Sequence, residues 1–380
     1  MKDAVTIREE VYDGNLDTLL DEGHRPQTHV SEERLSAFVD VYDKFLSRPN
    51  LPNRMRFQEA MGVSDFPYLF ADTIDRQLLA EYEAVVPNWR AFCSVNTARD
   101  FRDFKYYDVM GGRGQLDPVE EFAQYPERAK TDKAPLTAHV SKYGARVGLS
   151  WEAIINDDLG ALRRLPGDLA LAARRTEAKL VTGLYVAAAG PDGTLYSVGN
   201  KNIITSNPAL SGAALGTALA QLGSMVDQDG EPIIHDMVTL VVPPALKTVA
   251  FNIKNTMQFV DTEAGATANQ SAWVQNWVAP MFNIVVDPYI QIVCTDAAKK
   301  IASWFLFASA SSPRPAIEVR FLAGEEQPAI FTKTPNQSRV GGGLDNVSFE
   351  NDTQEMKVRH VIGGLQVEPK ATMASNGSGS

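Results

Sequence analysis

Three stretches in the first half of the chain place apolar residues three and four positions apart, the spacing of an amphipathic helix. The first follows Ser31, a suitable N-cap, and ends before Pro49. The second covers about residues 71–85. The third and longest covers about residues 166–189, with Pro166 in its first turn, and its apolar stripe predicts a helix long enough to cross a whole domain.

The stripe of the long helix sorts its side chains into an inward and an outward set. The inward set is Leu169, Ala172, Ala173, Thr176, Leu180 and Leu184, and the outward set is Arg174, Arg175 and Lys179. Just before it, Ser150 is a candidate N-cap for a shorter helix over residues 151–162.

The second half of the chain alternates between helix and strand patterns. Helices are expected over about residues 215–226 and 245–255, and short buried strands over 238–242, 283–286 and 303–308. Two later segments alternate apolar and polar residues as half-exposed strands do: Ile317 to Phe321, with Glu318 and Arg320 outward, and Met356 to Ile362. The Ser/Gly-rich residues 371–380 are expected to be a frayed, disordered tail. This mixture predicts an α+β fold, and no internal repeat is found.

Residues 96–147 differ from both halves because they are densely charged and poor in apolar residues. Nine Lys and Arg and eight Asp and Glu lie between Arg99 and Arg146. Two extended pieces flank a Gly-rich middle at Gly111–Gly114. We expect a long polar hairpin with a flexible loop, which needs a neighbour to cover it because ordering an isolated hairpin is costly in entropy.

Composition and charge narrow the classes of protein that fit. The chain has 380 residues, 44% of them apolar and 22% charged, as in soluble globular proteins. With 36 Lys and Arg against 47 Asp and Glu, the net charge is −11, so a general electrostatic nucleic-acid-binding face is not expected, although a local basic patch is not excluded. Neither a secretory signal nor an apolar run long enough to span a membrane is found. Cys93 and Cys294 are expected to be reduced, buried thiols.

No set of residues predicts catalysis, a cofactor or a metal site. The five histidines, His24, His29, His139, His235 and His360, lack ligand spacing and are expected on the surface. Asp157 and Asp158 are adjacent, so on a helix they point about 100° apart and suit a solvated face. Gly111–Gly114 and Gly341–Gly343 are expected to be a loop and a turn rather than phosphate cradles. A chain of this length without such chemistry is expected to be a binding or assembly protein, not an enzyme.

Several local segments, in this order, resemble the major capsid proteins of tailed bacteriophages, which have the Hong Kong 97-type shell fold. The segments are FADTIDRQLLAEY at residues 70–82 followed by Trp89, Tyr143-Gly144 leading into LSWE at 149–152, NDDLGAL at 156–162, and LVVPPAL at 240–246. The third is similar to the segment before the long helix in Mu-like major head subunits. The resemblance covers about residues 65–369.

The resemblance implies a division of the chain. It comprises an N-terminal arm with an amphipathic helix (1–70), the start of the peripheral domain (71–95), the extended loop (96–147), the peripheral domain with its long spine helix (148–212), the axial domain (213–349), returning peripheral strands (350–370) and the tail (371–380). Some relatives cross-link a loop lysine to an asparagine of a neighbour. Neither Lys130 and Lys133 nor Asn346 and Asn351 align to that chemistry, so no cross-link is predicted.

The function implied is self-assembly of hexamers and pentamers into an icosahedral shell enclosing double-stranded phage DNA, which the acidic chain would contact only non-specifically. Implied partners are a separate scaffolding protein, a portal and a decoration protein. The implied location is the virion capsid, assembled in the bacterial cytoplasm. Two alternatives remain open: an encapsulin-like compartment enclosing a cargo enzyme, which nucleic acid inside purified shells would exclude, and an enzyme with an unrecognised site. A third possibility is that the chain is itself another part of the virion, such as a decoration protein, but its length and its two-part α/β pattern argue against this.

Overall fold

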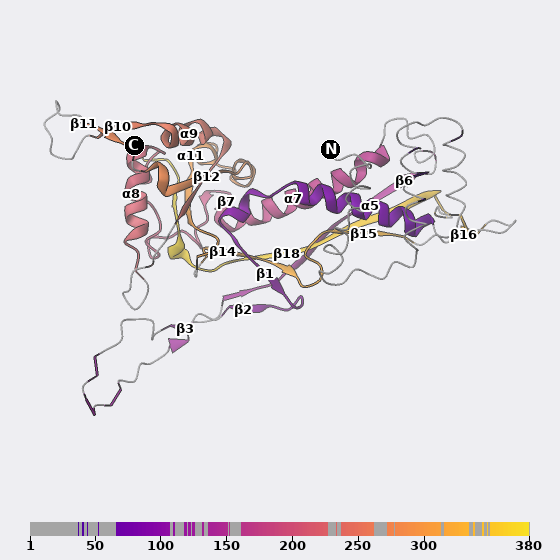
Figure 1. The fold of residues 1–380 in the computed structure, drawn as a ribbon, viewed down its shortest axis with the longest axis horizontal. Coiled ribbons are helices and arrows are strands. Elements are labelled where there is room, and N and C mark those ends of the chain that lie inside the picture. The colour runs from indigo at the N-terminus through magenta and orange to yellow at the C-terminus, as the bar shows by residue number, and fades with distance from the viewer. Residues whose placement is uncertain are drawn as a thin grey trace. The chain divides into compact units, whose positions relative to one another are not determined.

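The computed structural model describes residues 66–106, 136–150, 161–226, 237–261, 272–276, 278–312, 315–333 and 350–379, together with shorter pieces and single positions between them. Within this part the chain forms two compact units (Figure 1). Residues 1–85, 142–175 and 322–361 belong to the first unit, and residues 86–141, 176–321 and 362–380 to the second. The domain boundaries that the resemblance implies stay a prediction.

In the first unit, helices pack against a β-sheet. Helix α5 (Phe66–Ala84) confirms the helix expected near residues 71–85, and it contacts strand β15 (Ala329–Thr332). Strand β15 pairs with β18 (Thr353–Gln366), with Ala329 opposite Arg359, and β6 (Ser141–Ser150) also pairs with β18. Leu78 and Tyr82 of α5 are buried, as its stripe predicts. Short strands β16 (Gln337–Ser338) and β17 (Leu344–Asp345) form a small antiparallel pair.

The long helix is confirmed, but at different positions. Helix α7 covers Ala161–Tyr185, so Pro166 is its sixth residue rather than in its first turn. The expected end near residue 189 is wrong, because β7 (Val186–Ala187) turns back to pair with β8 (Gly190–Pro191). Gly190 takes φ +119°, which permits this tight return.

Two side chains of α7 differ in burial from what the stripe predicts. Ala172 is exposed, and Arg174, expected to point away, is 7% exposed. The guanidinium of Arg174 donates to the backbone carbonyl of Tyr82, so a partner 92 residues away in sequence draws it inward.

The second unit contains a four-stranded sheet in the order β12-β9-β13-β19. Strands β9 (Val238–Val242) and β12 (Phe282–Val286) are parallel, with Val238 opposite Phe282, and β13 (Trp304–Ala308) is antiparallel to β9. All three confirm expected strands, and every residue of β9 and β13 is buried. Helix α8 (Gly212–Gly223) is also confirmed, although it stops before Val226, and Ser211 caps it by accepting a hydrogen bond from the Ala214 amide.

The expected disordered tail is wrong. Residues Thr372–Ser375 form β19, whose four residues are buried and which pairs with β13, Leu306 lying opposite Met373. Gly377 has φ +67°, and a Cβ there would meet the Ala302 carbonyl oxygen at 2.4 Å. The small residues of this segment therefore permit close packing rather than disorder.

The rest of the second unit surrounds this sheet. It contains η1 (Asn88–Ala91), β1 (Ser94–Ala98), η2 (Pro244–Leu246), α9 (Lys247–Asn255), β10 (Gln258–Asp261), β11 (Ala272–Gln275), η3 (Ala279–Met281), α10 (Ile290–Val293), α11 (Lys299–Ala302), β14 (Ile317–Leu322) and η4 (Pro369–Ala371). Strand β14 pairs with β1 and with the last part of β18. The expectation that Glu318 of β14 is exposed is wrong, since it is 3% exposed beside Arg320.

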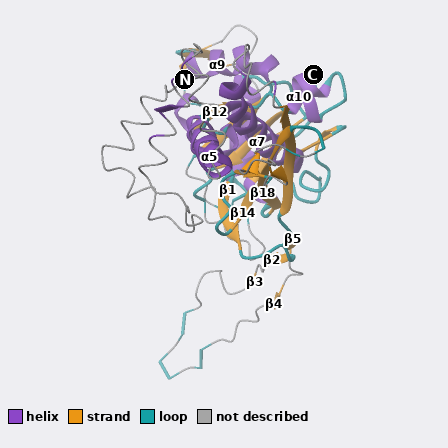
Figure 2. Cartoon of the chain, turned by 90° about the vertical axis from the view of Figure 1, so that its right-hand side faces the viewer, coloured by secondary structure: helices purple, strands orange, loops and turns teal. Residues whose placement is uncertain are grey.

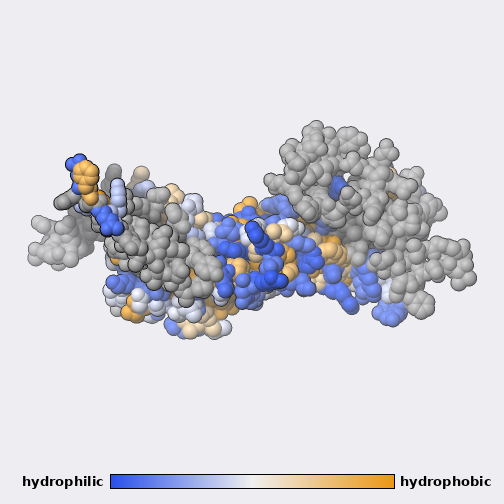
Figure 3. All heavy atoms as spheres, turned by 90° about the horizontal axis from the view of Figure 1, so that it is seen from below, coloured by the Kyte–Doolittle hydropathy of each residue, from blue (hydrophilic) through white to orange (hydrophobic). Residues whose placement is uncertain are grey.

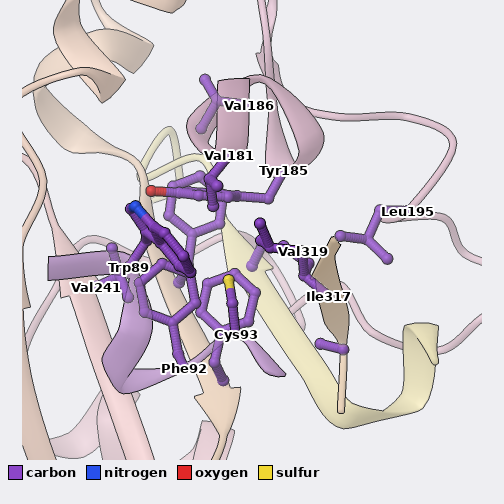
Figure 4. Packing of buried hydrophobic residues seen from close by; sticks show 14 of the residues in the cluster. Trp89, Phe92, Cys93, Val181, Tyr185, Val186, Leu195, Val241, Ile317 and Val319 are labelled. Atoms are coloured by element: carbon purple, nitrogen blue, oxygen red, sulfur yellow. The ribbon is translucent and has the colours of Figure 1, made fainter. Parts of the chain in front are cut away.

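An aromatic core fills the second unit between its sheets and α7. Phe92 stacks on Phe307 at a ring distance of 4.5 Å, and Tyr185 meets Phe305 and Phe307 edge-on. Figure 4 shows Phe92 and Tyr185 in this core. Cys93 and Cys294 are buried and free, as expected. Trp89 and Trp304 are buried too.

The charged segment forms the expected two-stranded arrangement where it is described. Strand β2 (Phe104–Tyr106) pairs with β5 (Leu136–Ala138), and β3 (Val109–Met110) pairs with β4 (Thr131–Asp132). In Figure 2 these strands follow one another away from β1 and β14. Of the N-terminal arm, Ala37, Asp40, Val41 and Lys44 are described and helical, and the rest of that expected helix lies outside the described residues. Of the helix expected over residues 151–162, the structure describes Glu152, which is helical, and residues 161 and 162, which belong to α7.

Candidate functional site

Of the candidate residues of the sequence, the structure describes His139 and His360. His139 is exposed beside Asp103, with 3.6 Å between its Nδ1 and the Asp103 Oδ1. The expectation of a surface position is wrong for His360, which is 3% exposed and meets the Tyr82 ring edge-on. The remaining candidates lie outside the described residues: His24, His29, His235, Asp157, Asp158, Gly111–Gly114 and Gly341–Gly343. Over the described part of the chain, no three His, Cys, Asp or Glu side chains gather as metal ligands would.

Asp287, directly after β12, is a buried carboxylate whose side chain accepts three hydrogen bonds. Its Oδ2 accepts hydrogen bonds from the Thr182 hydroxyl at 2.6 Å and from the Tyr185 hydroxyl, and its Oδ1 accepts from the Tyr289 amide at 2.8 Å. Burial, and secondarily the charge of Asp287, raise the pKa values of Cys93 and Tyr185 well above their usual range. Both groups therefore keep their protons near neutral pH, and neither the Cys93 thiol nor the Tyr185 hydroxyl is a ready nucleophile. The hydrogen bonds of Asp287 join α7 to the end of β12.

The charged segment 96–147 carries exposed aromatic side chains among charged ones, outside its short paired strands. Phe101 is 52% exposed, Tyr125 82%, and Phe122 is fully exposed. At the base of the hairpin, the Arg320 guanidinium lies over the Phe104 ring, 4.0 Å from its centre. Exposed rings of this size are costly in water, so this segment is suited to contact with another protein surface.

A second polar surface lies on the sheet of the first unit. Residues of β18 alternate in burial, so that Met356 and Val358 are buried while Lys357 is exposed. Glu355, on the same side as Lys357, binds Lys333 at 3.0 Å and Arg146 at 3.3 Å. The hydrogen bond from Lys333, helped by the charge of Arg146, lowers the pKa of Glu355.

The same surface contains an aromatic ring that two cations contact. The Lys357 ammonium lies 5.2 Å and the Arg359 guanidinium 4.5 Å from the centre of the Phe331 ring. Arg359 also pairs with Glu325. We name Arg146, Lys333, Lys357 and Arg359 the cationic face. The sequence did not predict the cationic face, because its residues come from three separate segments of the chain. The alternation of apolar and polar residues in β18 was the one usable signal, since it places Lys357 and Arg359 on the same side of that strand.

The described surface seen in Figure 3 mixes hydrophilic and hydrophobic side chains. Among the large apolar side chains, Met257 is 87%, Val198 85% and Val86 75% exposed. None of the described helices has the length and apolar character needed to cross a membrane. The exposed rings and the charged sheet surface are suited to contacts with other proteins.

Comparisons with known proteins give a family. A family model described as "Phage capsid protein" matches residues 133–374, more than half of the chain. A search of curated protein sequences finds no match. Solved structures that are similar include chains from Mycobacterium phage Patience (12% identity, TM-score 0.45, covering 82% of this chain and 87% of that one) and Gordonia phage Cozz (10%, 0.44, 74% and 83%). The capsid structure of Cyanophage P-SCSP1u is also similar (13%, 0.41, 74% and 85%).

The family assignment rests on the sequence match, since these TM-scores are below 0.5. It confirms the resemblance to phage capsid proteins that the order of local segments indicated. The chain therefore belongs to the phage capsid protein family and is a structural protein of a viral shell.

Proposed function

We propose that this chain is the major subunit of a Hong Kong 97-type shell, in which hexamers and pentamers of the chain enclose double-stranded phage DNA. The observation that carries the proposal is the family match over residues 133–374, taken together with the exposed rings of Phe122 and Tyr125. A chain that leaves such rings in water as a monomer gains stability when neighbours cover them.

The proposed division of labour follows from the resemblance. Residues 96–147 act as the extended loop, α7 as the spine helix of the peripheral domain, and residues 213–349 as the axial domain, joined there by β19. Residues 1–70 act as an arm that contacts neighbours. The chain itself performs no catalysis, and its many weak charged contacts let wrongly placed subunits dissociate before the shell closes.

Proposed partners are a separate scaffolding protein, a portal and a decoration protein. The proposed location is the virion capsid, after assembly in the bacterial cytoplasm. The net charge of −11 supports a weak, non-specific relation to the packaged DNA, because a strongly basic lining would hold DNA back during packaging.

Sedimentation velocity of the purified chain tests the proposal. We expect a fast-sedimenting particle of uniform size in addition to capsomer-sized species, with nucleic acid in particles that have packaged. A single monomer boundary at every concentration would contradict the proposal. Uniform particles that hold a cargo enzyme and no nucleic acid would favour an encapsulin-like compartment instead.

A further inference from the structure

We propose that Lys254 and Asn88 close the outer edge of β12, and so keep this strand from pairing with the β12 of a second copy of the chain. Within the described part of the second unit, β12 and β19 are the two end strands of the sheet β12-β9-β13-β19. The end strand of a sheet presents backbone groups with which a strand of another molecule can pair. The inference goes beyond the proposed function, because it concerns a contact between copies that the fold prevents.

The backbone of β12 shows which of its residues face the outer edge. The Asp287 amide donates to the Val242 carbonyl oxygen of β9 at 2.9 Å, so the backbone groups of residue 287 point toward β9. Along a strand, the backbone groups of consecutive residues point alternately to one neighbouring strand and to the other. The residues of β12 whose backbone groups point away from β9 are therefore Phe282, Ile284 and Val286.

Two side chains bind the outermost carbonyl groups of this edge. Lys254, near the end of α9, donates from its Nζ to the Phe282 carbonyl oxygen at 3.1 Å, and its ammonium lies 5.7 Å from the centre of the Phe282 ring. Asn88 of η1 donates from its Nδ2 to the Val286 carbonyl oxygen at 3.0 Å. A strand arriving at this edge would need both carbonyl groups as acceptors. Ile284 alone lies between them, and one residue is too short a stretch for a stable strand pair.

The sequence of β12 explains why its edge needs protection. Its five residues, FNIVV, include one aromatic and three β-branched side chains and no charge. This composition is typical of segments that pair between molecules. Ile284 and Val286 are only half-buried, so burial does not remove them from contact with another copy. A lysine placed on a strand edge is a common protection against such pairing.

Removing both donors tests the proposal. Lys254→Met with Asn88→Ala, the edge variant, keeps much of the volume of the lysine side chain but leaves both carbonyl groups open to another strand. We expect the edge variant to aggregate about tenfold faster than the wild-type chain, the factor that about 1.4 kcal/mol gives. Light scattering at a temperature well below unfolding measures the rate. Lys254→Arg, which keeps a donor at this position, should aggregate as slowly as the wild type.

A matched control and a melting curve exclude other causes. Lys247→Met with Asn252→Ala makes the same two changes at exposed positions of α9, and it should behave as the wild type does. Equal rates for the edge variant and this control would overturn the proposal. Circular dichroism shows whether the edge variant stays folded. Aggregation that begins only where the circular dichroism signal is lost would also overturn the proposal, because unfolding would then be the cause.

Cysteine cross-linking shows whether β12 is the strand that pairs. The native cysteines are buried, so Ile284→Cys adds a thiol on the edge strand that an added oxidant can reach. Two β12 strands paired antiparallel about this position bring its Cα atoms to about 5.5 Å, within the range of a disulfide. We expect about tenfold more linked dimers when Ile284→Cys is combined with the edge variant than when it stands alone. Aggregates of the edge variant that do not cross-link at residue 284 would overturn the assignment to β12.

Discussion

The Arg174 guanidinium of α7 donates from both Nε and Nη2 to the Tyr82 carbonyl oxygen of α5, at 3.0 and 2.7 Å. It also lies over the Tyr82 ring, 3.4 Å from its centre. Since α5 ends at Ala84, Tyr82 contributes one of the last carbonyls, which have no partner within the helix. One buried cation thus satisfies the end of α5, complements its dipole and joins it to α7.

Replacing this cation should loosen α5. Arg174→Met keeps much of the side-chain volume but removes both hydrogen bonds and the contact with the ring. We expect the free energy of unfolding to fall by about 2–4 kcal/mol, the usual cost of breaking a buried charged contact. Urea denaturation followed by circular dichroism measures this loss. Arg175→Met, at the exposed neighbouring position, should change the free energy by less than about 0.5 kcal/mol. Equal effects of the two substitutions would contradict the role given to Arg174.

The C-terminal strand should be essential to the second unit. Met373 of β19 is fully buried opposite Leu306, so Met373→Ala leaves a cavity in the core. We expect it to lower the free energy of unfolding by about 2–5 kcal/mol, whereas Ser378→Ala at an exposed position should have little effect. Thermal unfolding of both variants measures the difference. A wild-type melting temperature for Met373→Ala would mean that the tail is dispensable.

The two thiols should be inert in the folded chain. Cys93 and Cys294 are both buried, and burial raises the pKa of Cys93, which keeps its thiolate scarce at neutral pH. We expect an aromatic disulfide reagent to label neither thiol over hours at pH 8, and both within minutes in 6 M guanidinium chloride. Rapid labelling of either thiol without denaturant would show that this part of the core opens.

Stability should fall in alkaline solution. The pKa values of Cys93 and Tyr185 are raised in the folded chain, whereas in the unfolded chain these groups lose protons near pH 9 and 10. Deprotonation therefore favours unfolding, and the stability present below pH 9 is lost as the pH rises above it. One such group contributes a slope of about 1.4 kcal/mol per pH unit. Melting temperatures between pH 7 and 11 measure the decline, which Cys93→Ala should make shallower. An identical decline in that variant would assign the effect to other groups.

The sequence was informative where local pattern decides the structure. The β-branched run that ends before Pro243 marks β9, because a strand break depends on neighbouring residues alone. The two extended pieces of the charged segment, β2 and β5, were likewise predicted from the spacing of their apolar residues.

Distant partners explain what the sequence did not show. Arg174 looked exposed because its partner, the Tyr82 carbonyl, lies 92 residues away. The Ser/Gly-rich tail looked disordered because composition does not reveal that β13 offers it an open edge. The cationic face escaped notice for the same reason, since Arg146, Lys333 and Lys357 meet only when three strands pair.

The central claim is that many copies of this chain complete one another in a closed shell. Negative-stain electron microscopy of the purified chain tests it most directly. The account predicts closed particles of uniform diameter, together with rings of five and six subunits. Well-ordered single chains at high concentration, with Phe122 and Tyr125 still in water and no larger species, would contradict it.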